Sequence, residues 1–360
     1  MTAGRTPPPT RATVDGRTYL DLRAMAKKTG RANDEYCARC QRQRSADSAS
    51  RCVTNRTAVL RGMAGRAPIY NKEWERVMCA LQESVAGPNL VIVESTCRPR
   101  VIGEPSADRL LSGPSFIGVV DGSTLKPWES PHRADGGQIA SVVAQTLESL
   151  PASTSAREAV NCLTAAVHSL WTNTTEPVNQ RPCATFAVLA VARRELWRVG
   201  DAWLLVDGQS VAPERSIEQT VALERANLLR ERLGRGARLD DLLRGDPGRA
   251  TILPRLSELS LLRNAADSYT FGAIDGSTIP DAYVEVIALP VNAHEVVIAS
   301  DGYPGVAATL AETEAALRDR VTRDPLMIEE PPTTKGVMPG ADSFDDRSFI
   351  RVRLPEVGQA

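Results

Sequence analysis

Aspartates follow short apolar stretches at several places in the sequence, where they could bind a metal. A carboxylate at the edge of a hydrophobic core is costly to desolvate unless it is hydrogen-bonded, paired with a cation or bound to a metal. No matching set of basic residues follows the same stretches, and oxygen ligands without His or Cys favour Mg²⁺ or Mn²⁺ over zinc. Alternatively each aspartate forms a turn, because Asp-Gly commonly follows a strand. The residues are Asp108 (EPSADR), Asp121 (VVDG), Asp201 (RVGD), Asp301 (ASDG) and Asp346 (FDDRS).

The order and spacing of these motifs resemble those of the PPM/PP2C family of metal-dependent protein serine/threonine phosphatases, over about residues 88 to 354. The resemblance implies two Mg²⁺ or Mn²⁺ ions between two β-sheets. In that scheme Asp121 bridges the ions, the carbonyl of Gly122 adds an oxygen, and Asp301 and Asp346 complete the two sites.

Two further aspartates match the same family pattern. Asp108 matches the second residue of a Glu-Asp pair near the second ion, and Asp201 matches an aspartate that helps to hold a third, weaker ion. Two cations about 3.5 to 4 Å apart can share a water, lower its pKa and aim it at a phosphorus atom. The resemblance therefore implies hydrolysis of phosphate monoesters, with phosphoserine or phosphothreonine in proteins as expected substrates.

The sequence also departs from the family pattern. Ala107 replaces the usual Glu or Gln, and Arg347 follows Asp346 where Asn is usual. Gly103 stands where some members have a phosphate-binding arginine, a role that nearby arginines could take; the candidates are Arg98, Arg100 and Arg109, with Arg109 placed among the catalytic residues. Two other functions therefore stay open: hydrolysis of a small phosphorylated metabolite, and a catalytically silent regulatory or binding module with the same fold.

The segment after Asp121 and Gly122 reads STLKPWESPHRADGG and contains His132. This histidine is a candidate general acid for the leaving alkoxide, and its alternative is a solvated loop residue. A second copy of the first motif occurs in FGAIDGST, where Asp275 and Gly276 have no counterpart in the family pattern. We interpret this second copy as a hairpin turn.

The elements that must position these residues are short strands and longer helices. Strands are expected at about 89–95, 115–122, 185–194, 195–208, 268–274, 282–289, 295–300 and 348–354, and helices at 137–150, 155–171 and 304–322. Strands that cluster rather than alternate with helices argue for an α+β fold. The expected architecture is a four-layer αββα sandwich of two antiparallel sheets, with helix pairs on both outer faces.

The first 88 residues differ in texture and form a basic N-terminal extension, expected to be partly helical from about Tyr19 to Arg44. Cys37, Cys40 and Cys52 within it could hold zinc or be unpaired thiols. Residues 89–356 form the phosphatase-like domain, with a helical insert at about 213–265.

Composition limits the partners. The 43 basic and 44 acidic residues give a net charge of −1, so no global field recruits nucleic acid or an anionic membrane. The sequence lacks an apolar run of about 18 residues, and its beginning lacks a secretion signal. Seven cysteines without a repeating spacing fit a reducing compartment. A cytoplasmic bacterial protein that acts on a phosphorylated protein or metabolite is expected.

Overall fold

The computed structural model describes residues 11–14, 17–20, 90–123, 135–171, 177, 180–211, 218–265 and 271–355. The chain divides into two compact units, Met1–Tyr70 and Asn71–Ala360. In the first unit, β1 (Arg11–Val14) pairs antiparallel with β2 (Arg17–Leu20). The predicted helix is therefore wrong at Tyr19 and Leu20, and its remainder lies outside the described residues, as do the three cysteines of this region.

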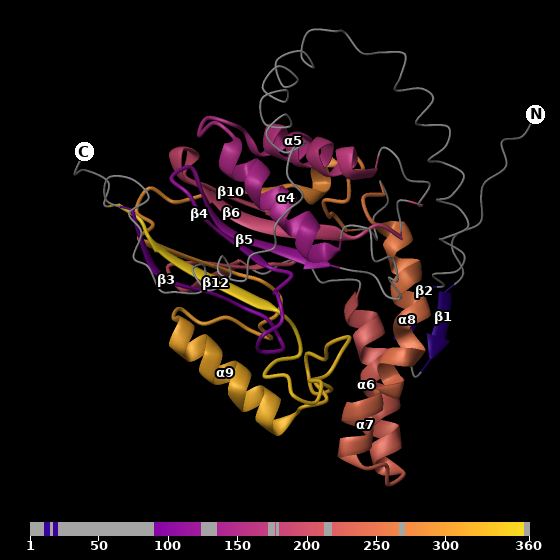
Figure 1. Cartoon of the computed structure of the whole chain (residues 1–360). Helices are drawn as coiled ribbons and strands as arrows, with labels where there is room; N and C mark the ends of the chain where they lie inside the picture. The colour runs from indigo at the N-terminus through magenta and orange to yellow at the C-terminus, as the bar shows by residue number, and fades with distance from the viewer. Residues whose placement is uncertain are drawn as a thin grey trace, which may run out of the picture. The chain divides into compact units, whose positions relative to one another are not determined.

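The second unit contains two antiparallel sheets of five strands each (Figure 1). The first sheet has the order β10 (Glu285–Ala288), β7 (Glu195–Val199), β6 (Cys183–Ala190), β5 (Phe116–Ser123), β4 (Arg109–Ser112). The second has the order β3 (Val91–Arg98), β12 (Arg347–Arg353), β11 (Glu295–Ala299), β8 (Trp203–Val206), β9 (Gln209–Val211).

Strand β5 has both faces buried, which explains why its sequence is continuously apolar. Ile117 and Val119 belong to the core between the two sheets, whereas Phe116 and Val120 belong to the core under the helices. Because successive side chains of a strand point to opposite faces, a strand in the middle of a layered fold needs apolar residues at both sets of positions. The polar residue that ends this run, Asp121, is thereby placed at the edge of the sandwich.

Helices cover the outer faces of both sheets, so the predicted αββα sandwich is confirmed. Helices α4 (Gly136–Ser149) and α5 (Ala156–His168) pack on the first sheet. Ser155 and Glu158 form the predicted capping box of α5. On the second sheet, the described helix is α9 (Leu310–Arg323) alone, packed with the chain that follows it, where a helix pair was expected.

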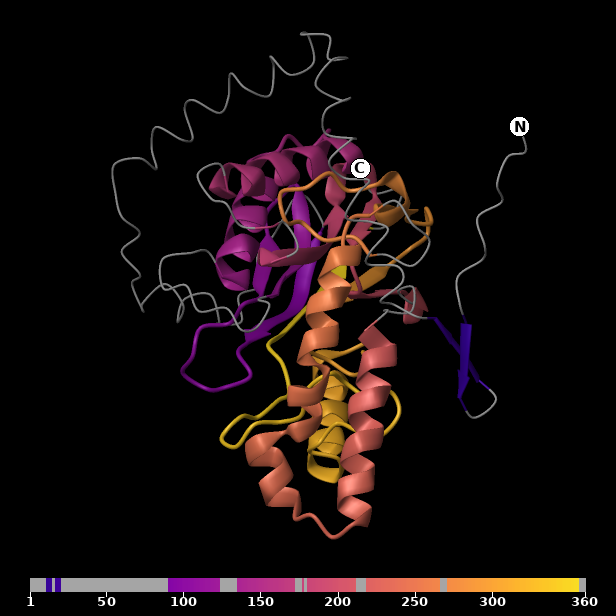
Figure 2. The same cartoon turned by 90° about the vertical axis from the view of Figure 1, so that its right-hand side faces the viewer.

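A helical insert lies between β9 and β10, as predicted, and its helices lie side by side in Figure 2. It consists of α6 (Glu218–Gly234), α7 (Leu239–Gly245) and α8 (Pro247–Leu259). Short 3₁₀ turns are η1 (Ser169–Trp171), η3 (Val191–Arg193), η4 (Ser260–Leu262) and η5 (Asp281–Tyr283). Among the helices of the described residues, none combines the length and the apolar composition that crossing a membrane requires.

Two expected strands differ from the observed ones. The stretch at 195–208 is not one strand but β7 and β8, which belong to different sheets and are separated at Gly200 and Asp201. The stretch at 268–274 shows only isolated bridges at Phe271 and Ile274 among its described residues. The chain crosses from one sheet to the other at Asp201. This crossing brings Asp201 to the same end of the sandwich as Asp121.

Candidate active site

At one end of the sandwich, carboxylates from distant parts of the chain lie close enough to change one another's pKa values. Asp121, near the end of β5, hydrogen-bonds to the side chain of Asp301, which follows β11. Burial raises the pKa of Asp121 well above its ordinary value, and the charges of Asp108 and Asp301 raise it further. The pKa of Asp301 is raised by desolvation and by Asp345, although its exposure to solvent weakens the first cause. A hydrogen bond between two carboxyl groups requires that one of them carries a proton.

Asp108 is the most deeply buried of these acids, with 1% of its surface exposed. Its Oδ2 accepts hydrogen bonds from the hydroxyls of Ser300 at 2.7 Å and Ser348 at 2.8 Å. Its Oδ1 is buried and has no hydrogen-bond partner among the described residues. Burial raises its pKa to about 7, against the lowering effect of the two serines. A buried acceptor without a donor is costly, which indicates that another group binds there.

Asp201 and Glu218 extend the cluster from the turn after β7 and from the start of α6. Burial, together with the charges of Asp301 and Glu218, raises the pKa of Asp201 to about 8. The pKa of Glu218 is also raised, first by desolvation and then by Asp301, although its side chain keeps contact with solvent. The helical insert therefore contributes an acidic group to this end of the sandwich.

The two adjacent aspartates before β12 act on different parts of the cluster: both charges raise the pKa of Asp108, but Asp345 also acts on Asp121 and Asp301. The negative charge of Asp345 raises the pKa of Asp121 and Asp301. The carboxylate of Asp346 instead accepts hydrogen bonds from the backbone N–H of Arg100 at 2.9 Å and of Ala107 at 2.6 Å. Both oxygens of Asp346 are therefore used to hold the chain between β3 and β4.

Glycines at two positions allow the backbone segments of this region to approach closely. A Cβ on Gly122 would lie 2.2 Å from the carbonyl oxygen of Gly136, at the start of α4. A Cβ on Gly302 would lie 1.9 Å from the carbonyl oxygen of Asp346. Only glycine fits such contacts without displacing backbone. The Asp-Gly sequences after β11 and within β5 therefore pack aspartate-bearing turns against their neighbours.

The chemistry of these side chains fits a divalent cation site. Carboxylate oxygens are the ligands that Mg²⁺ and Mn²⁺ prefer, and the buried Oδ1 of Asp108 offers a further oxygen. Within the described ranges, no group of three or more His, Cys, Asp or Glu side chains is placed to hold one ion. Asp121 instead shares a proton with Asp301, and Asp345 is paired with Lys335 at 2.5 Å.

Two of the three arginines considered for phosphate binding, Arg98 and Arg109, contact other parts of the chain. Arg109 donates from Nε to Ser141 of α4 at 2.9 Å and from Nη1 to the carbonyls of Ser106 and Asp108 at 2.6 Å each. Arg98 lies 3.8 Å from Glu314 of α9. The contacts of Arg109 position the segment that carries Asp108.

Arg347, a departure from the family pattern, points away from the carboxylate cluster. Its guanidinium is buried and pairs with Glu314 at 2.9 Å and with Asp342 at 3.3 Å. The next residue of β12, Ser348, points to Asp108, as strand alternation requires. Arg347 therefore fastens α9 to β12 and does not neutralise the site.

The predicted general acid, His132, lies outside the described residues, within 124–134. Its role stays a prediction. The histidine His168 of α5 is described and has Nδ1 at 3.1 Å from the carbonyl oxygen of Gly276. That contact ties α5 to the loop after Ile274 and gives His168 a structural role.

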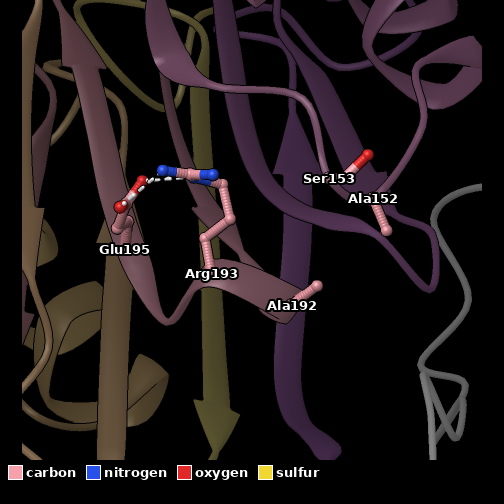
Figure 3. Close-up of a pocket in the computed structure, with 5 residues that line it drawn as sticks. All are labelled: Ala152, Ser153, Ala192, Arg193 and Glu195. Atoms are coloured by element: carbon pink, nitrogen blue, oxygen red, sulfur yellow. Dashed lines mark hydrogen bonds and ion pairs between the residues drawn. The ribbon is translucent and has the colours of Figure 1, made fainter.

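A shallow depression of about 520 Å³ lies elsewhere on the domain (Figure 3). It is lined by Ala152, Ser153, Ala192, Arg193 and Glu195. The register of β5 with β6 pairs Phe116 with Ala190 and Asp121 with Thr185, so this depression lies at the opposite end of the sheet from Asp121. The separation along β5 is about 17 Å at 3.3 Å per residue, and the depression is not part of the carboxylate cluster.

The second Asp-Gly copy is a structural turn and not a part of this cluster. Asp275 is fully buried and pairs with Arg263 at 2.8 Å. Its Oδ1 accepts from the backbone N–H of Ser277 at 2.8 Å and from Asn264 at 3.1 Å. The turn is present as predicted, but it connects an isolated bridge to η5 and does not join two strands of a hairpin.

Asp275→Asn is therefore expected to lower stability and leave cation binding unchanged. Removing one partner of a buried ion pair costs about 3–5 kcal/mol, because the remaining charge of Arg263 is left uncompensated. Urea unfolding measures the stability, and calorimetry with Mn²⁺ measures binding to the folded variant. Loss of cation binding with unchanged stability would contradict this assignment.

The raised pKa values also predict how stability depends on pH. Asp108 and Asp201 have pKa values of about 7 and about 8, above the ordinary 3.8. Between these limits the folded protein holds more protons than the unfolded chain, so stability falls as pH rises. Without divalent cations, the free energy of unfolding is expected to decrease by about 3–4 kcal/mol from pH 6 to pH 8. Urea unfolding in EDTA measures this, and saturating Mn²⁺ is expected to offset the loss at pH 8.

The reasoning from sequence missed residues that the structure brings to the site. They are Glu218, Ser300, Lys335, Asp345 and Ser348. One signal for Lys335 was present, because it is the only lysine after Lys126 in a chain that otherwise uses arginine. No signal marks Glu218, since an acidic residue in the first turn of a helix is common for the helix itself.

Comparisons with known proteins give matches only among solved structures. No protein-family model matches the chain, and no curated protein matches it. The chain is similar to the catalytic domain of the serine/threonine protein phosphatase PstP in complex with two manganese ions, at 16% identity and a TM-score of 0.40, covering 74% of this chain and 99% of that chain.

Two further solved structures give comparable likenesses. The PPM Ser-Thr phosphatase MsPP from Mycobacterium smegmatis, in complex with cacodylate, has 15% identity and a TM-score of 0.38, covering 73% of this chain and 98% of that chain. The serine/threonine phosphatase Stp1 from Staphylococcus aureus has 12% identity and a TM-score of 0.38, covering 76% and 98%. The αββα fold is defined by the strand order and core of the present chain and does not depend on these likenesses.

Proposed function

We propose that residues 89–356 form a metal-dependent phosphatase that hydrolyses phosphate monoesters, with phosphoserine and phosphothreonine in proteins as substrates. The observation that supports this proposal is the hydrogen-bonded pair of Asp121 and Asp301 within a cluster of carboxylates of raised pKa. Carboxylates crowded in this way repel one another unless protons or cations neutralise them. Divalent cations are the neutralising groups that such oxygen ligands prefer.

The residues that would hold the cations are Asp121, the carbonyl of Gly122, Asp301 and Asp345. Asp108 and Asp201 would lie at the second and at a third, weaker position. Asp345 replaces Asp346 in this set because Asp346 is bonded to backbone amides. Mg²⁺ or Mn²⁺ bound there would lower the pKa of a water toward neutrality and offset negative charge on the phosphoryl oxygens.

The other groups of the chain prepare the site for an anionic substrate. Asp108, with a pKa of about 7, can hold or release a proton near neutral pH. Lys335 and Arg249 bring positive charge, since both lower the pKa of Glu218. His132 stays the candidate proton donor to the leaving alkoxide. These charges would favour binding of a phosphate ester next to the carboxylates.

Titration calorimetry with Mn²⁺, followed by turnover of p-nitrophenyl phosphate, tests the proposal. We expect saturable Mn²⁺ binding and hydrolysis that requires the metal. A phosphopeptide panel and a panel of phosphorylated metabolites, assayed in parallel, then separate the two substrate classes. Absence of both Mn²⁺ binding and metal-dependent turnover between pH 6 and 9 would overturn the proposal.

A silent binding module is the second candidate, and one observation favours it. Lys335 pairs with Asp345, so one carboxylate of the cluster already has a cation. In a silent module this pair would persist at millimolar Mn²⁺ and no turnover would follow. If titration with Mn²⁺ gives no heat of binding although the protein unfolds cooperatively, the silent binding module is supported.

A further inference from the structure

Lys335 is a positive charge placed inside the carboxylate cluster. Its Nζ lies 2.5 Å from Oδ2 of Asp345, and each side chain has 27% of its surface exposed. The same ammonium lowers the pKa of Asp301 and Glu218. Lys335 therefore acts on carboxylates from three separate segments, and its partner Asp345 is one of the proposed cation ligands.

The backbone before Lys335 is held by the helical insert, and the backbone after it by the loop that follows α9. Arg225 of α6, which is fully buried, donates from Nη1 to the carbonyl of Thr333 at 3.1 Å. Arg249 of α8 donates from Nη1 to the carbonyl of Thr334 at 3.1 Å. On the other side, the N–H of Val337 donates to the carbonyl of Pro325 at 2.9 Å. The loop thus holds the lysine at the cluster, while its four-carbon stem leaves the ammonium free to move.

A carboxylate that is paired with an ammonium binds a divalent cation less tightly, because the two cations compete for the same negative charge. A cation that binds Asp345 must displace Lys335 or share the oxygens with it. The Oδ2 of Asp345 is the oxygen that contacts the lysine, so the competition concerns that carboxylate.

We infer that Lys335 is a built-in competitor of the divalent cation at Asp345, held in place by the helical insert, and that it sets the cation affinity of the site. This inference rests on the proposed function, since it concerns the same carboxylates. Lysine suits the role better than arginine, because an arginine would bind a carboxylate through two parallel hydrogen bonds and would leave it less readily.

The test is calorimetric titration of Mn²⁺ into the full-length wild type, Lys335→Met, Lys335→Gln and Lys335→Arg. Removal of the ammonium is expected to tighten Mn²⁺ binding by up to about fivefold, which corresponds to about 1 kcal/mol, the upper end for a partly exposed ion pair. Lys335→Arg is expected to bind Mn²⁺ no more tightly than the wild type. Arg323→Met, which removes an exposed charge of α9 paired with Asp319, is the matched control and is expected to match the wild type.

The outcomes separate this inference from the proposed function. If the wild type and Lys335→Met bind Mn²⁺ equally, or the variants bind it more weakly, the competitor role is overturned while the cation site stands. If Lys335→Met and Lys335→Gln bind Mn²⁺ and the wild type does not, the competitor role is supported in its strongest form. If no variant binds Mn²⁺ and all unfold cooperatively, both the inference and the proposed function fail.

Discussion

Asp121→Asn is expected to abolish metal-dependent hydrolysis and, at the same time, to stabilise the cation-free protein. The carboxyl of Asp121 is half-buried, hydrogen-bonded to Asp301 and repelled by the charge of Asp108. Asparagine has nearly the same shape and carries no charge, so it removes this repulsion together with the proposed ligand. Hydrolysis of p-nitrophenyl phosphate with Mn²⁺ should fall by more than about a hundredfold.

Replacing an aspartate that has only a structural role would not raise the stability, so the gain in stability distinguishes the two roles of Asp121. In EDTA at pH 8, we expect the free energy of unfolding in urea to rise by about 1–2 kcal/mol, since the raised pKa of Asp121 means that its charged form opposes folding. Asp207→Asn is the matched control: Asp207 also follows a strand, but its Oδ1 accepts from the N–H groups of His294 and Glu295 at 2.9 Å each. Wild-type Mn²⁺ affinity in Asp121→Asn would contradict the proposed ligand set.

The layers of the fold were predictable because they depend on local patterns. Apolar residues on both faces of β5 indicate a strand buried on both sides, and the capping box at Ser155 marks the start of α5. These signals lie within a few residues of one another. The sequence therefore contained the αββα class before any contact between distant segments was known.

The passage of the chain from one sheet to the other could not be predicted in the same way. The stretch from Glu195 to Val206 has strand composition throughout, yet Gly200 adopts a φ of +106° and the strand stops there. A side chain at Gly200 would meet Thr185 at 2.4 Å, a contact made only after the neighbouring strand is in place. Tertiary packing, and not local propensity, places Asp201 at the site.

The same limit explains the choice between the two aspartates before β12. Alternation along an extended strand would put Asp346 on the side of Ser348, which contacts Asp108. Asp346 does act on Asp108, since its charge raises the pKa of that residue, whereas Asp345 lies in the bend at residues 342–345, where alternation does not hold. The amides of Arg100 and Ala107, which bind Asp346, lie about 240 positions earlier in the sequence, at separations of 246 and 239. No pattern near Asp346 could reveal them.

Asp345→Asn and Asp346→Asn are therefore expected to have opposite effects, and this pair tests the placement of the site most directly. Asp345→Asn removes a proposed ligand that is partly exposed and paired with Lys335. We expect a loss of hydrolysis of more than about a hundredfold and Mn²⁺ binding too weak for calorimetry. Its stability should change by less than about 1 kcal/mol, as for other exposed ion pairs.

Asp346→Asn is expected to reduce stability and to keep the activity. Asparagine has one acceptor oxygen where aspartate has two, so its NH₂ group would face the backbone N–H of either Arg100 or Ala107. A buried donor left without an acceptor costs about 1–3 kcal/mol. Hydrolysis by the folded variant should stay within about tenfold of the wild type. If Asp346→Asn instead abolishes Mn²⁺ binding at unchanged stability, then Asp346 is the ligand, and its carboxylate must leave both amides when the cation binds.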